Sequence, residues 1–133
     1  MTSGELPENM FLLGRMDGEK MLRRMQSADA LIFPTRMEGF GLVAAEAQAC
    51  GLPVIASSCS SLPEVIEHGK TGLLCPCGDV ASFAQAARRL ANDSNEWQSM
   101  SQEAVKRAKN LFSIDNMVRQ YIRVYEEVLS LTK

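Results

Sequence analysis

Residues 28–57 read ADALIFPTRMEGFGLVAAEAQACGLPVIAS, and this stretch decides the fold. One apolar run, LIF, ends at Pro34, and another, VIA, follows Pro53. Runs that are apolar at every position are typical of parallel strands covered on both faces, and proline is excluded from the interior of such strands. Between the runs, the alanine-rich segment 42–50 predicts a helix that ends at Gly51. The stretch therefore predicts a strand–helix–strand unit.

The loop before this helix combines glycines with a carboxylate. In open α/β sheets, ligands lie outside the carboxyl ends of the strands, where helix N-termini point. The first amides of the helix have no intrahelical partner, and the helix dipole adds positive charge there. Gly39 and Gly41 let a ligand approach the backbone closely, which favours a phosphate. Glu38 precedes the helix and Glu46 lies roughly 7–8 Å along it. The two carboxylates are placed to bind hydroxyls on either side of a diphosphate, as in a nucleotide sugar.

The segment Glu38-GFGLVAA-Glu46 resembles the E-x7-E motif of retaining glycosyltransferases with the GT-B fold, most closely glycosyltransferase family 4 (group 1). The stretch SLPEVIEHGKTGLLCPCGD at 61–79 also resembles that family, and the similarity extends from Phe11 to the last helix, which contains Tyr125. The alternative is an ordinary glycine-rich turn with two solvated glutamates. The order of strand, loop and helix around the motif favours the family.

The resemblance implies transfer of a hexosyl group from a nucleotide diphosphate sugar, with retention at the anomeric carbon. It implies that Glu38 is the catalytic residue, which orients the sugar through its hydroxyls, and that Glu46 accepts hydrogen bonds from the ribose. The other donor-binding residues that it implies here offer close backbone approach or amides to the sugar and diphosphate: Gly39, Phe40, Gly41 and Leu42. No cofactor or metal is implied, because amides and the helix dipole already face the diphosphate.

The N-terminal part predicts a short strand at 10–14, then a loop, then a helix at 19–28. Three apolar residues of this helix are expected to face inward: Met21, Leu22 and Met25. In the family, the loop after this strand lies against the nucleobase. The resemblance therefore implies that Arg15 and Met16 contact the base, mostly through their backbone. The alternative is that Arg15 caps a strand end in solvent.

After residue 57 the sequence predicts a serine-rich loop, a short helix at 63–67 and a strand at 71–75. Ser60 and Ser61 stand where the family often has two glycines. This departure puts a tight backbone contact there in doubt, although serine hydroxyls are suitable replacements. Glu64 favours the positive end of the short helix, and we interpret it as structural.

The C-terminal third predicts three capped helices. Asp79 is placed to cap a helix at 80–91, Asp93 opens the next with a D-x-x-E variant of the capping box, and Ser113 caps the last. The residues expected to face the core from the first two are Val80, Phe83, Ala87, Leu90 and Ala91, then Trp97, Met100, Ala104, Ala108 and Leu111. The last helix carries a broad apolar stripe of Ile114, Met117, Val118, Tyr121, Ile122, Tyr125, Val128 and Leu129. Part of this stripe is expected to be exposed or to contact a partner chain.

The composition excludes several classes of protein. The chain has 133 residues, enough for one domain, with 46% hydrophobic and 23% charged residues, as in ordinary globular proteins. A formal net charge of −2 gives no electrostatic basis for binding nucleic acid. No apolar run approaches the roughly 20 residues that span a bilayer, and the N-terminus has no basic, apolar signal segment. We therefore expect a cytoplasmic protein, in the cytosol or at the inner face of the membrane.

The cysteines predict neither a disulfide scaffold nor a metal site. They are Cys50, Cys59, Cys75 and Cys77. Cys50 ends a helix and Cys75 ends a strand, so both are expected to pack as small apolar side chains. The C-x-C spacing of Cys75 and Cys77 is too short for the usual zinc knuckle, and His68 is the only histidine. We expect His68 to be a solvated loop residue.

Taken together, the sequence predicts one α/β domain over residues 1–133, with a Rossmann-like doubly wound sheet of about four parallel strands and a helical tail at about 94–131. The resemblance implies a GT-B C-terminal domain truncated at its N-terminal side. Direct pairing of 10–14 with 31–33, exchange with another copy, or pairing with a separate N-terminal portion would complete the sheet. The expected ligand is a nucleotide-sugar donor. The alternatives are a non-catalytic remnant or assembly module and, less favoured, a related GT-B epimerase or phosphorylase.

Overall fold

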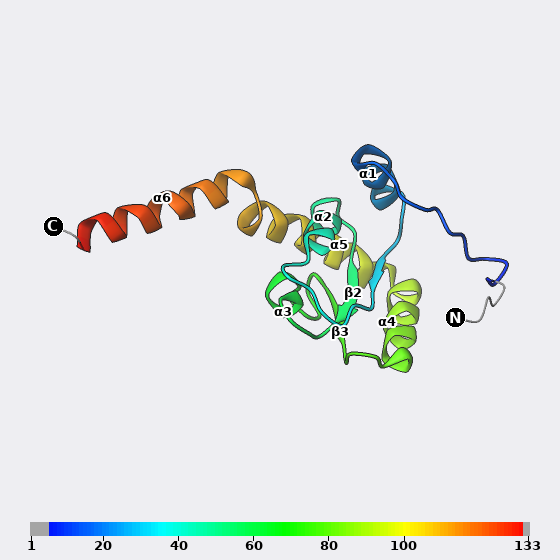
Figure 1. Ribbon diagram of the computed structural model, residues 1–133. Coiled ribbons are helices and arrows are strands. Elements are labelled where there is room, and N and C mark those ends of the chain that lie inside the picture. Colours follow the sequence, from blue (N-terminus) through cyan, green and yellow to red (C-terminus); the bar gives the residue numbers. More distant parts are fainter. Residues whose placement is uncertain (1–5, 132–133) are drawn as a thin grey trace.

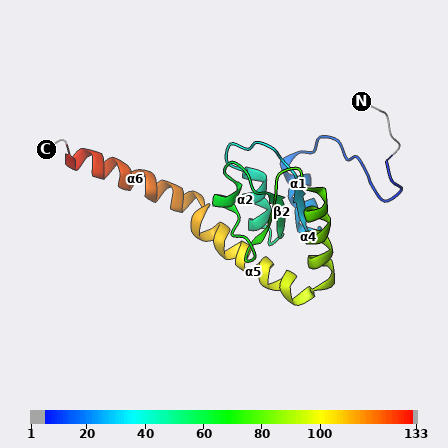
Figure 2. The same cartoon turned by 90° about the horizontal axis from the view of Figure 1, so that it is seen from below.

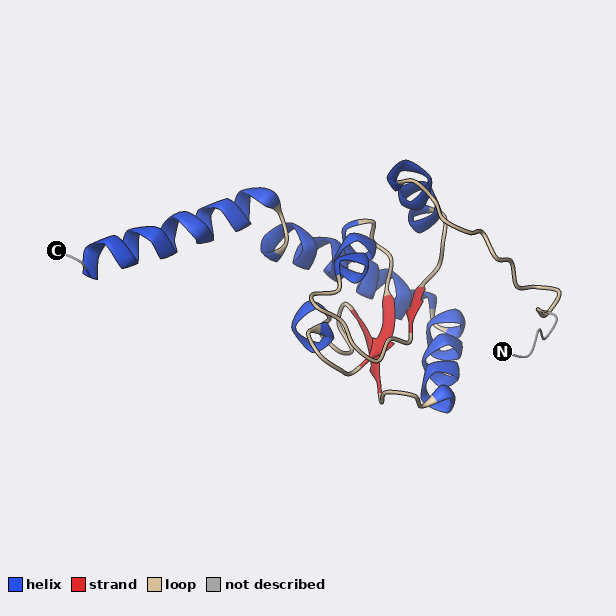
Figure 3. Cartoon of the chain, viewed as in Figure 1, coloured by secondary structure: helices blue, strands red, loops and turns tan. Residues whose placement is uncertain are grey.

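The computed structural model describes residues 6–131, and at its centre lies a parallel sheet of three strands with helices on both faces (Figure 1; Figure 3). The strands are β1 (Leu31–Phe33), β2 (Val54–Ser57) and β3 (Gly72–Cys75). They lie in the order β1-β2-β3, and Ile55 of β2 stands opposite Ile32 on one side and Leu73 on the other. The predicted Rossmann-like α/β class is confirmed, with three strands in place of about four.

Helices cover this sheet unevenly. Within residues 6–131 they are α1 (Gly18–Gln26), α2 (Leu42–Ala49), α3 (Leu62–Val65), α4 (Val80–Asn92), α5 (Ser94–Leu111) and α6 (Ile114–Leu131). One face of the sheet packs against α2, α3 and the end of α1, and the opposite face packs against α4. The helix α6 leaves the body and projects into solvent (Figure 2).

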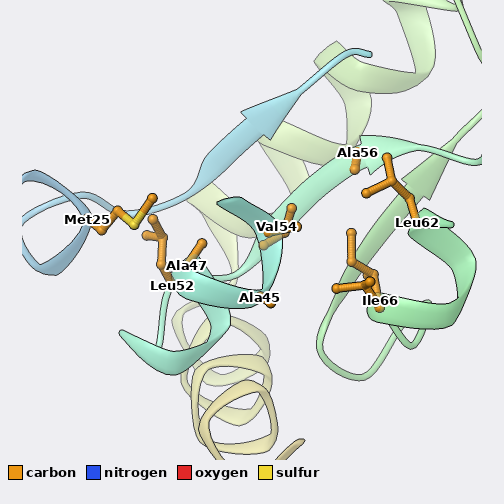
Figure 4. Packing of buried hydrophobic residues seen from close by; sticks show 10 residues of the cluster. Met25, Ala45, Ala47, Leu52, Val54, Ala56, Leu62 and Ile66 are labelled. Carbon is orange, nitrogen blue, oxygen red and sulfur yellow. The ribbon is translucent and has the colours of Figure 1, made fainter. Parts of the chain in front are cut away.

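Strand β2 explains why the apolar runs of the sequence have no polar alternation. Val54 and Ala56 belong to the cluster on the α2 face, whereas Ile55 packs with Phe83 of α4 on the other face. Successive strand residues point to opposite faces, so a strand covered on both sides is apolar throughout. Figure 4 shows the first cluster, in which α2, β2 and Leu62 at the start of α3 share one core.

Strand β3 approaches β2 closely because its first residue is a glycine. A Cβ added to Gly72 would lie 2.2 Å from the carbonyl oxygen of Val54, its register partner. No residue with a side chain fits at this position without moving the two strands apart. Gly72 therefore allows the close approach of β3 to β2.

Helix α5 belongs to the body of the protein, although the sequence placed it in a helical tail. Met100 packs in the cluster with α4, and Ser101 lies beside Gly51 at the end of α2. At the far end, the ring of Phe112 contacts the ring of Phe40, just before α2 begins. Helix α5 thus runs antiparallel to α2 and carries the chain from one face of the sheet to the other.

The start of α5 is fixed by polar contacts. The Asp93 side chain accepts a hydrogen bond of 2.9 Å from the Glu96 N–H, so the predicted N-cap is confirmed. Glu96 pairs with Arg89 of α4, where the capping-box pattern had predicted a bond back to the cap residue. The indole Nε1 of Trp97 donates a bond of 2.6 Å to the carbonyl oxygen of Asp29, just before β1. These contacts join α4, α5 and the sheet.

The prediction of a strand at 10–14 is wrong. This segment has no regular secondary structure and makes no ladder with β1, so the proposed direct pairing with 31–33 is wrong as well. Its apolar side chains, including Phe11 and Leu12, are exposed. Without neighbouring strands, the local apolar pattern is not sufficient to form a strand.

Several predicted side-chain orientations also differ. Val80, in the first turn of α4, is 80% exposed, and Ala86 is buried on the predicted face. In the same way Leu22, Ala91 and Leu111 lie on exposed flanks of their helices. Helix α1 begins one residue earlier than predicted, since Asp17 caps it by accepting the Lys20 N–H. Burial at helix ends depends on where neighbouring elements stop, which periodicity does not specify.

Candidate donor-binding site

The loop between β1 and α2 turns into the helix at Gly41. This residue is the N-cap of α2 and has a left-handed backbone, with φ of 91°. A Cβ added there would also lie 2.8 Å from Cδ2 of Leu62. Both the left-handed backbone conformation and the lack of room for a side chain therefore require glycine at position 41. Gly39, in contrast, has open space around it and an unremarkable φ, so the sequence argument for backbone freedom holds only for Gly41.

The N-terminus of α2 presents unused amides beside this turn. The carbonyl oxygen of Gly41 accepts bonds from the N–H groups of Ala44 and Ala45, at 2.9 and 3.1 Å. Among residues 6–131, no acceptor binds the N–H of Leu42 or Val43. The helix dipole adds positive partial charge at the same place. This end of α2 is therefore suited to an anionic group such as a phosphate.

Glu38 lies at the entrance of the turn and is half-buried. Its Oε1 atom accepts a bond of 3.2 Å from the Gly39 N–H, and its carbonyl oxygen accepts a bond of 3.3 Å from the Ser61 hydroxyl. The side chain passes close to Gly41, since a Cβ on Gly41 would stand 3.6 Å from Cγ of Glu38. The backbone of Glu38 is thus anchored to the loop before α3, while its second carboxylate oxygen stays available to a ligand.

Glu46 lies on the exposed side of α2 and borders a hollow between α1 and α2. The same hollow is lined by Gly18, Met21 and Met25 of α1. Glu46 makes no ion pair within the described part of the chain. Burial, together with the nearby Glu46 carboxylate, raises the pKa of the Cys50 thiol at the end of the helix. Glu38 and Glu46 therefore flank α2, one at its N-terminus and one over the α1 side.

Arg15 and Met16 lie in the irregular segment before α1. Arg15 is exposed, and Met16 is half-buried against α1 on the side of Lys20 and Arg23. The hollow beside Glu46 is bordered by Gly18, two residues further on. The structure thus brings the beginning of α1 to Glu46, but the side chain of Met16 faces a different part of α1.

Phe40 and Leu42 have exposed side chains. The Phe40 ring is 45% exposed and makes an edge-to-face contact with Phe112, with ring centroids 5.7 Å apart. This geometry is a favourable one for aromatic pairs. Phe40 therefore attaches the loop to the end of α5.

Sequence reasoning missed Leu62 and Arg107, which support the loop from behind. Helix α3 carries Ser61 at its N-cap and Leu62 in its first turn, both in contact with the Glu38–Gly41 turn. Arg107 of α5 donates to the carbonyl oxygens of Val65 and Glu64, at 2.9 and 2.7 Å. The sequence gives only a weak signal for the role of Arg107, because this residue is separated from α3 by about forty residues of chain and lies on a helix with many charges.

Ser60 and Ser61 differ in backbone conformation and in their contacts. Ser60 has φ of 49°, the left-handed region that favours glycine, and it is the one residue other than glycine with a positive φ within residues 6–131. Ser61 has an ordinary φ of −78° and uses its hydroxyl to bond Glu38. Ser60 therefore adopts a conformation that favours glycine, at a conformational cost, and Ser61 adds a contact.

The polar residues outside this site have structural roles. Nδ1 of His68, an exposed residue as predicted, accepts a bond of 2.9 Å from the Leu74 N–H and so orders the turn before β3. The Glu64 side chain is exposed, and its carbonyl oxygen accepts the Arg107 bond. No group of three or more potential metal ligands occurs in the part of the chain that the structure covers. No helix between residues 6 and 131 is long and apolar enough to cross a membrane.

The fold and this site define a class of protein. An open parallel sheet with a glycine turn at a helix N-terminus is the Rossmann-like arrangement, and solved structures similar to it are glycosyltransferases of the GT-B fold. Residues 1–107 match the family model described as glycosyl transferases group 1, and the chain belongs to this family.

Individual relatives support this assignment. The chain is 35% identical over 124 residues to N-acetyl-alpha-D-glucosaminyl L-malate synthase of Bacillus anthracis, covering 93% of this chain and 32% of the relative. Sucrose-phosphate synthase from Thermosynechococcus elongatus superposes with a TM-score of 0.81 at 31% identity, over 90% of this chain and 30% of that one. Anabaena Alr3699/HepE, solved in complex with UDP-glucose, superposes with a TM-score of 0.74 at 25% identity, over 80% and 30%. The chain thus spans about a third of the length of these proteins.

Proposed function

We propose that this chain is the donor-binding portion of a retaining glycosyltransferase that transfers a hexosyl group from a nucleotide diphosphate sugar. The main support is the left-handed turn at Gly41, which leaves the amides of Leu42 and Val43 free at the N-terminus of α2. Glu38 precedes these amides in the chain, and Glu46 lies further along α2 on the side of α1. A diphosphate fits the amides, and hydroxyls on its two sides fit the carboxylates.

Each residue then has a separate role. Glu38 orients the transferred sugar through its hydroxyls near the reacting carbon. Gly39 leaves room for the donor to approach the loop, and Phe40, Gly41 and Leu42 donate backbone hydrogen bonds to the sugar and diphosphate. These donors are held in place before the reaction, so they stabilise developing negative charge without rearranging. The proposal requires no metal.

The nucleoside would lie toward the beginning of α1. Glu46 accepts hydrogen bonds from the ribose, beside the hollow bordered by Gly18. Arg15 and Met16, just before α1, contact the base through their backbone. The complex of Anabaena Alr3699/HepE with UDP-glucose makes uridine diphosphate a reasonable first probe.

A second candidate function is an assembly module that keeps the fold without catalysis. Helix α6 favours it, because an apolar stripe along its whole length is exposed and no residue of α6 is buried. The two candidates differ in whether the chain binds nucleotides, and this can be measured directly.

Calorimetry with nucleoside diphosphates distinguishes them, with Glu46→Ala as the decisive variant. This variant loses hydrogen bonds to a charged group. We therefore expect the binding of uridine diphosphate, or of whichever nucleoside diphosphate binds best, to weaken by about 1.5–3 kcal/mol, or roughly tenfold to a hundredfold. Alanine is a better helix former than glutamate, so the fold is expected to be unaffected. Glu126→Ala, on the exposed face of α6, serves as the matched control.

Two outcomes would contradict the proposal. Unchanged affinity in Glu46→Ala would mean that Glu46 is an ordinary solvated residue of α2. Absence of binding by every nucleoside diphosphate and sugar nucleotide in the panel would favour the assembly module.

A further inference from the structure

Three loops meet at one carbonyl oxygen beyond the carboxyl ends of the strands. The oxygen belongs to Thr35, two residues after β1. The Sγ atom of Cys59, after β2, lies 3.5 Å from it, and the Sγ atom of Cys77, after β3, lies 3.9 Å from it. The two sulfur atoms contact the same oxygen, so their separation is less than the sum of these distances. Two thiols from different loops therefore point at one place.

The two cysteines occupy equivalent positions after neighbouring strands. Ser57 and Cys75 are register partners at the ends of β2 and β3, and the Ser58 N–H extends the ladder with a bond of 2.7 Å to the Cys75 carbonyl. Cys59 and Cys77 each lie two residues further along. Neighbouring strands are about 4.8 Å apart, and a disulfide joins Cα atoms that are roughly 4.4–6.8 Å apart.

The chemical environment separates these two thiols from the others. Cys77 is exposed and Cys59 is half-buried, so a small reagent can reach them. Cys75 is 4% exposed, and burial, with a smaller effect from Asp79, raises its pKa. Burial also raises the pKa of the Cys50 thiol, at the far end of α2. Since the thiolate is the reactive form, Cys50 and Cys75 are disfavoured in disulfide exchange.

We propose that Cys59 and Cys77 form a reversible disulfide that links the loops after β2 and β3. The oxidant is a low-molecular-weight disulfide. The Cys77 thiolate attacks one of its sulfur atoms, forms a mixed disulfide and expels one small thiolate. The Cys59 thiolate then attacks the Cys77 sulfur and expels the second. Two electrons pass from the protein to the oxidant, and the two protons of the protein thiols end on the two released small thiols.

This link would act on the loop that carries Glu38. It closes the segment between Cys59 and Cys77, which contains α3, and it adjoins Ser61, whose hydroxyl bonds the Glu38 carbonyl. It also removes two S–H donors from Thr35, three residues before Glu38. The redox state of the pair is thereby coupled to the position of Glu38. This consequence rests on the proposed function, whereas formation of the link does not.

The test equilibrates the full chain in mixtures of oxidised and reduced glutathione, then blocks free thiols and maps the peptides by mass spectrometry. We expect a Cys59–Cys77 peptide, loss of two free thiols per chain, and complete reversal by excess reduced glutathione. In Cys59→Ser the reaction is expected to stop at a glutathione adduct on Cys77, and in Cys77→Ser no link forms. Cys50→Ser is the matched control and is expected to form the link as wild type does.

Other results would overturn the proposal. A Cys77–glutathione adduct that persists in wild type, or a link to Cys75 or Cys50 in place of Cys59, would refute the disulfide. Hydrogen exchange of the amides at 36–41 tests the coupling, and equal rates in the oxidised and reduced forms would refute it. Failure to bind any nucleotide would refute the proposed function and leave the disulfide standing.

Discussion

At the scale of single residues, Ser60 is the clearest point of backbone strain in the described chain. Its φ of 49° is costly for any residue with a Cβ, by about 1–2 kcal/mol. The neighbouring Ser61 has φ of −78° and holds the Glu38 carbonyl through its hydroxyl. The two serines have the same chemistry and opposite effects on stability, so they form a matched pair for mutation.

We expect Ser60→Gly to raise the free energy of unfolding by roughly 1 kcal/mol, because glycine adopts the left-handed conformation without strain. The gain is reduced by the greater entropy of glycine in the unfolded chain. Ser61→Gly is expected to lower the free energy of unfolding by about 1–2 kcal/mol, because it removes a hydrogen bond and adds that entropy without relieving strain. Urea denaturation of both variants measures the difference, and a destabilised Ser60→Gly would show that its side chain has an unrecognised contact.

The residues of the candidate site were partly accessible from the sequence. Glu38, Gly41 and Glu46 are local to one helix and its preceding turn, so motif spacing was enough to relate them. Arg107 and Phe112 reach the same loop from α5, and no local pattern connects them to it. Contacts of this kind depend on the path of the chain through space, which a sequence pattern does not contain.

At the scale of elements, α3 is too short to be stable alone, since a four-residue helix has few internal hydrogen bonds. Side chains from α2 and α5 stabilise its C-terminal end. Gln48 of α2 donates a bond of 3.1 Å to the Val65 carbonyl, and Arg107 donates to both Val65 and Glu64. Arg107 also lies 3.4 Å from the Glu67 carboxylate. The position of the Glu38 loop therefore depends on α3, and α3 depends on α5.

Arg107→Met is expected to lower the free energy of unfolding by roughly 2 kcal/mol, because the carbonyl groups at the end of α3 lose a charged donor. Hydrogen exchange is expected to speed up at the amides of 64–66 in particular. Lys106→Met is the control: it removes only an exposed ion pair with Glu103 and should change stability by less than about 1 kcal/mol. Equal effects of the two substitutions would mean that Arg107 does not hold α3.

The capping residue of helix α4 leads to a prediction about how the stability of the protein depends on pH. The Asp79 carboxylate accepts bonds from the Ser82 hydroxyl at 2.5 Å and the Ser82 N–H at 3.1 Å, and these bonds lower the pKa of Asp79 below its ordinary value of about 3.9. Because the folded pKa is lower than the unfolded pKa, this contribution to stability is complete above about pH 4 and is lost as the pH falls through the folded pKa. Asp79→Asn keeps an acceptor but does not titrate, so its stability is expected to fall less steeply below about pH 4. Unfolding midpoints measured from acid to neutral pH test this, and parallel curves for the two proteins would contradict it.

Helix boundaries were predictable from the sequence to within a few residues because their capping residues are local. Asp79, Asp93 and Ser113 all cap as expected, each accepting a backbone N–H three residues on. The irregular structure at 10–14 was not predictable in the same way. A strand forms only beside another strand. An apolar run therefore gives a segment a tendency to form a strand, and the segment becomes one only where the sheet offers it a neighbouring strand.

At the scale of the whole molecule, apolar surface is exposed at both ends of the described chain. Met10, Phe11 and Leu12 are exposed before α1, and the full stripe of α6 is exposed after α5. In Figure 1, these segments extend on opposite sides of the sheet. Exposed apolar patches of this kind favour association with a partner or with a second copy.

We therefore expect the chain alone to form a dimer or larger species in light scattering, and to transfer no sugar to an acceptor in solution. Transfer requires an acceptor held against the donor and protected from water, whereas the Glu38 loop is open on its outer side. Replacing two exposed residues of α6, Tyr121→Glu with Tyr125→Glu, is expected to reduce the association without changing the core. A monomeric wild-type chain with measurable turnover would contradict both expectations.

The overall class was predictable because the apolar strands, the alanine-rich helix and the glycine turn all lie within 28–57. The resemblance to a family then supplied the chemistry of the loop. The paths of α5 and α6 were less predictable, since both helices have similar apolar stripes. Helix α5 packs against α2 and α4 and contributes buried side chains to the core. Helix α6 has no buried residue within the described chain.

The bond from Trp97 to Asp29 has a practical consequence for spectroscopy. Trp97 is the only tryptophan of the chain, it is half-buried, and its indole joins the first turn of α5 to the residues before β1. Its fluorescence therefore reports the docking of α5 on the sheet and is insensitive to the state of α6. Circular dichroism detects both helices. A urea titration followed by the two signals would therefore separate the fraying of α6 from the collapse of the sheet, with no label added to the protein.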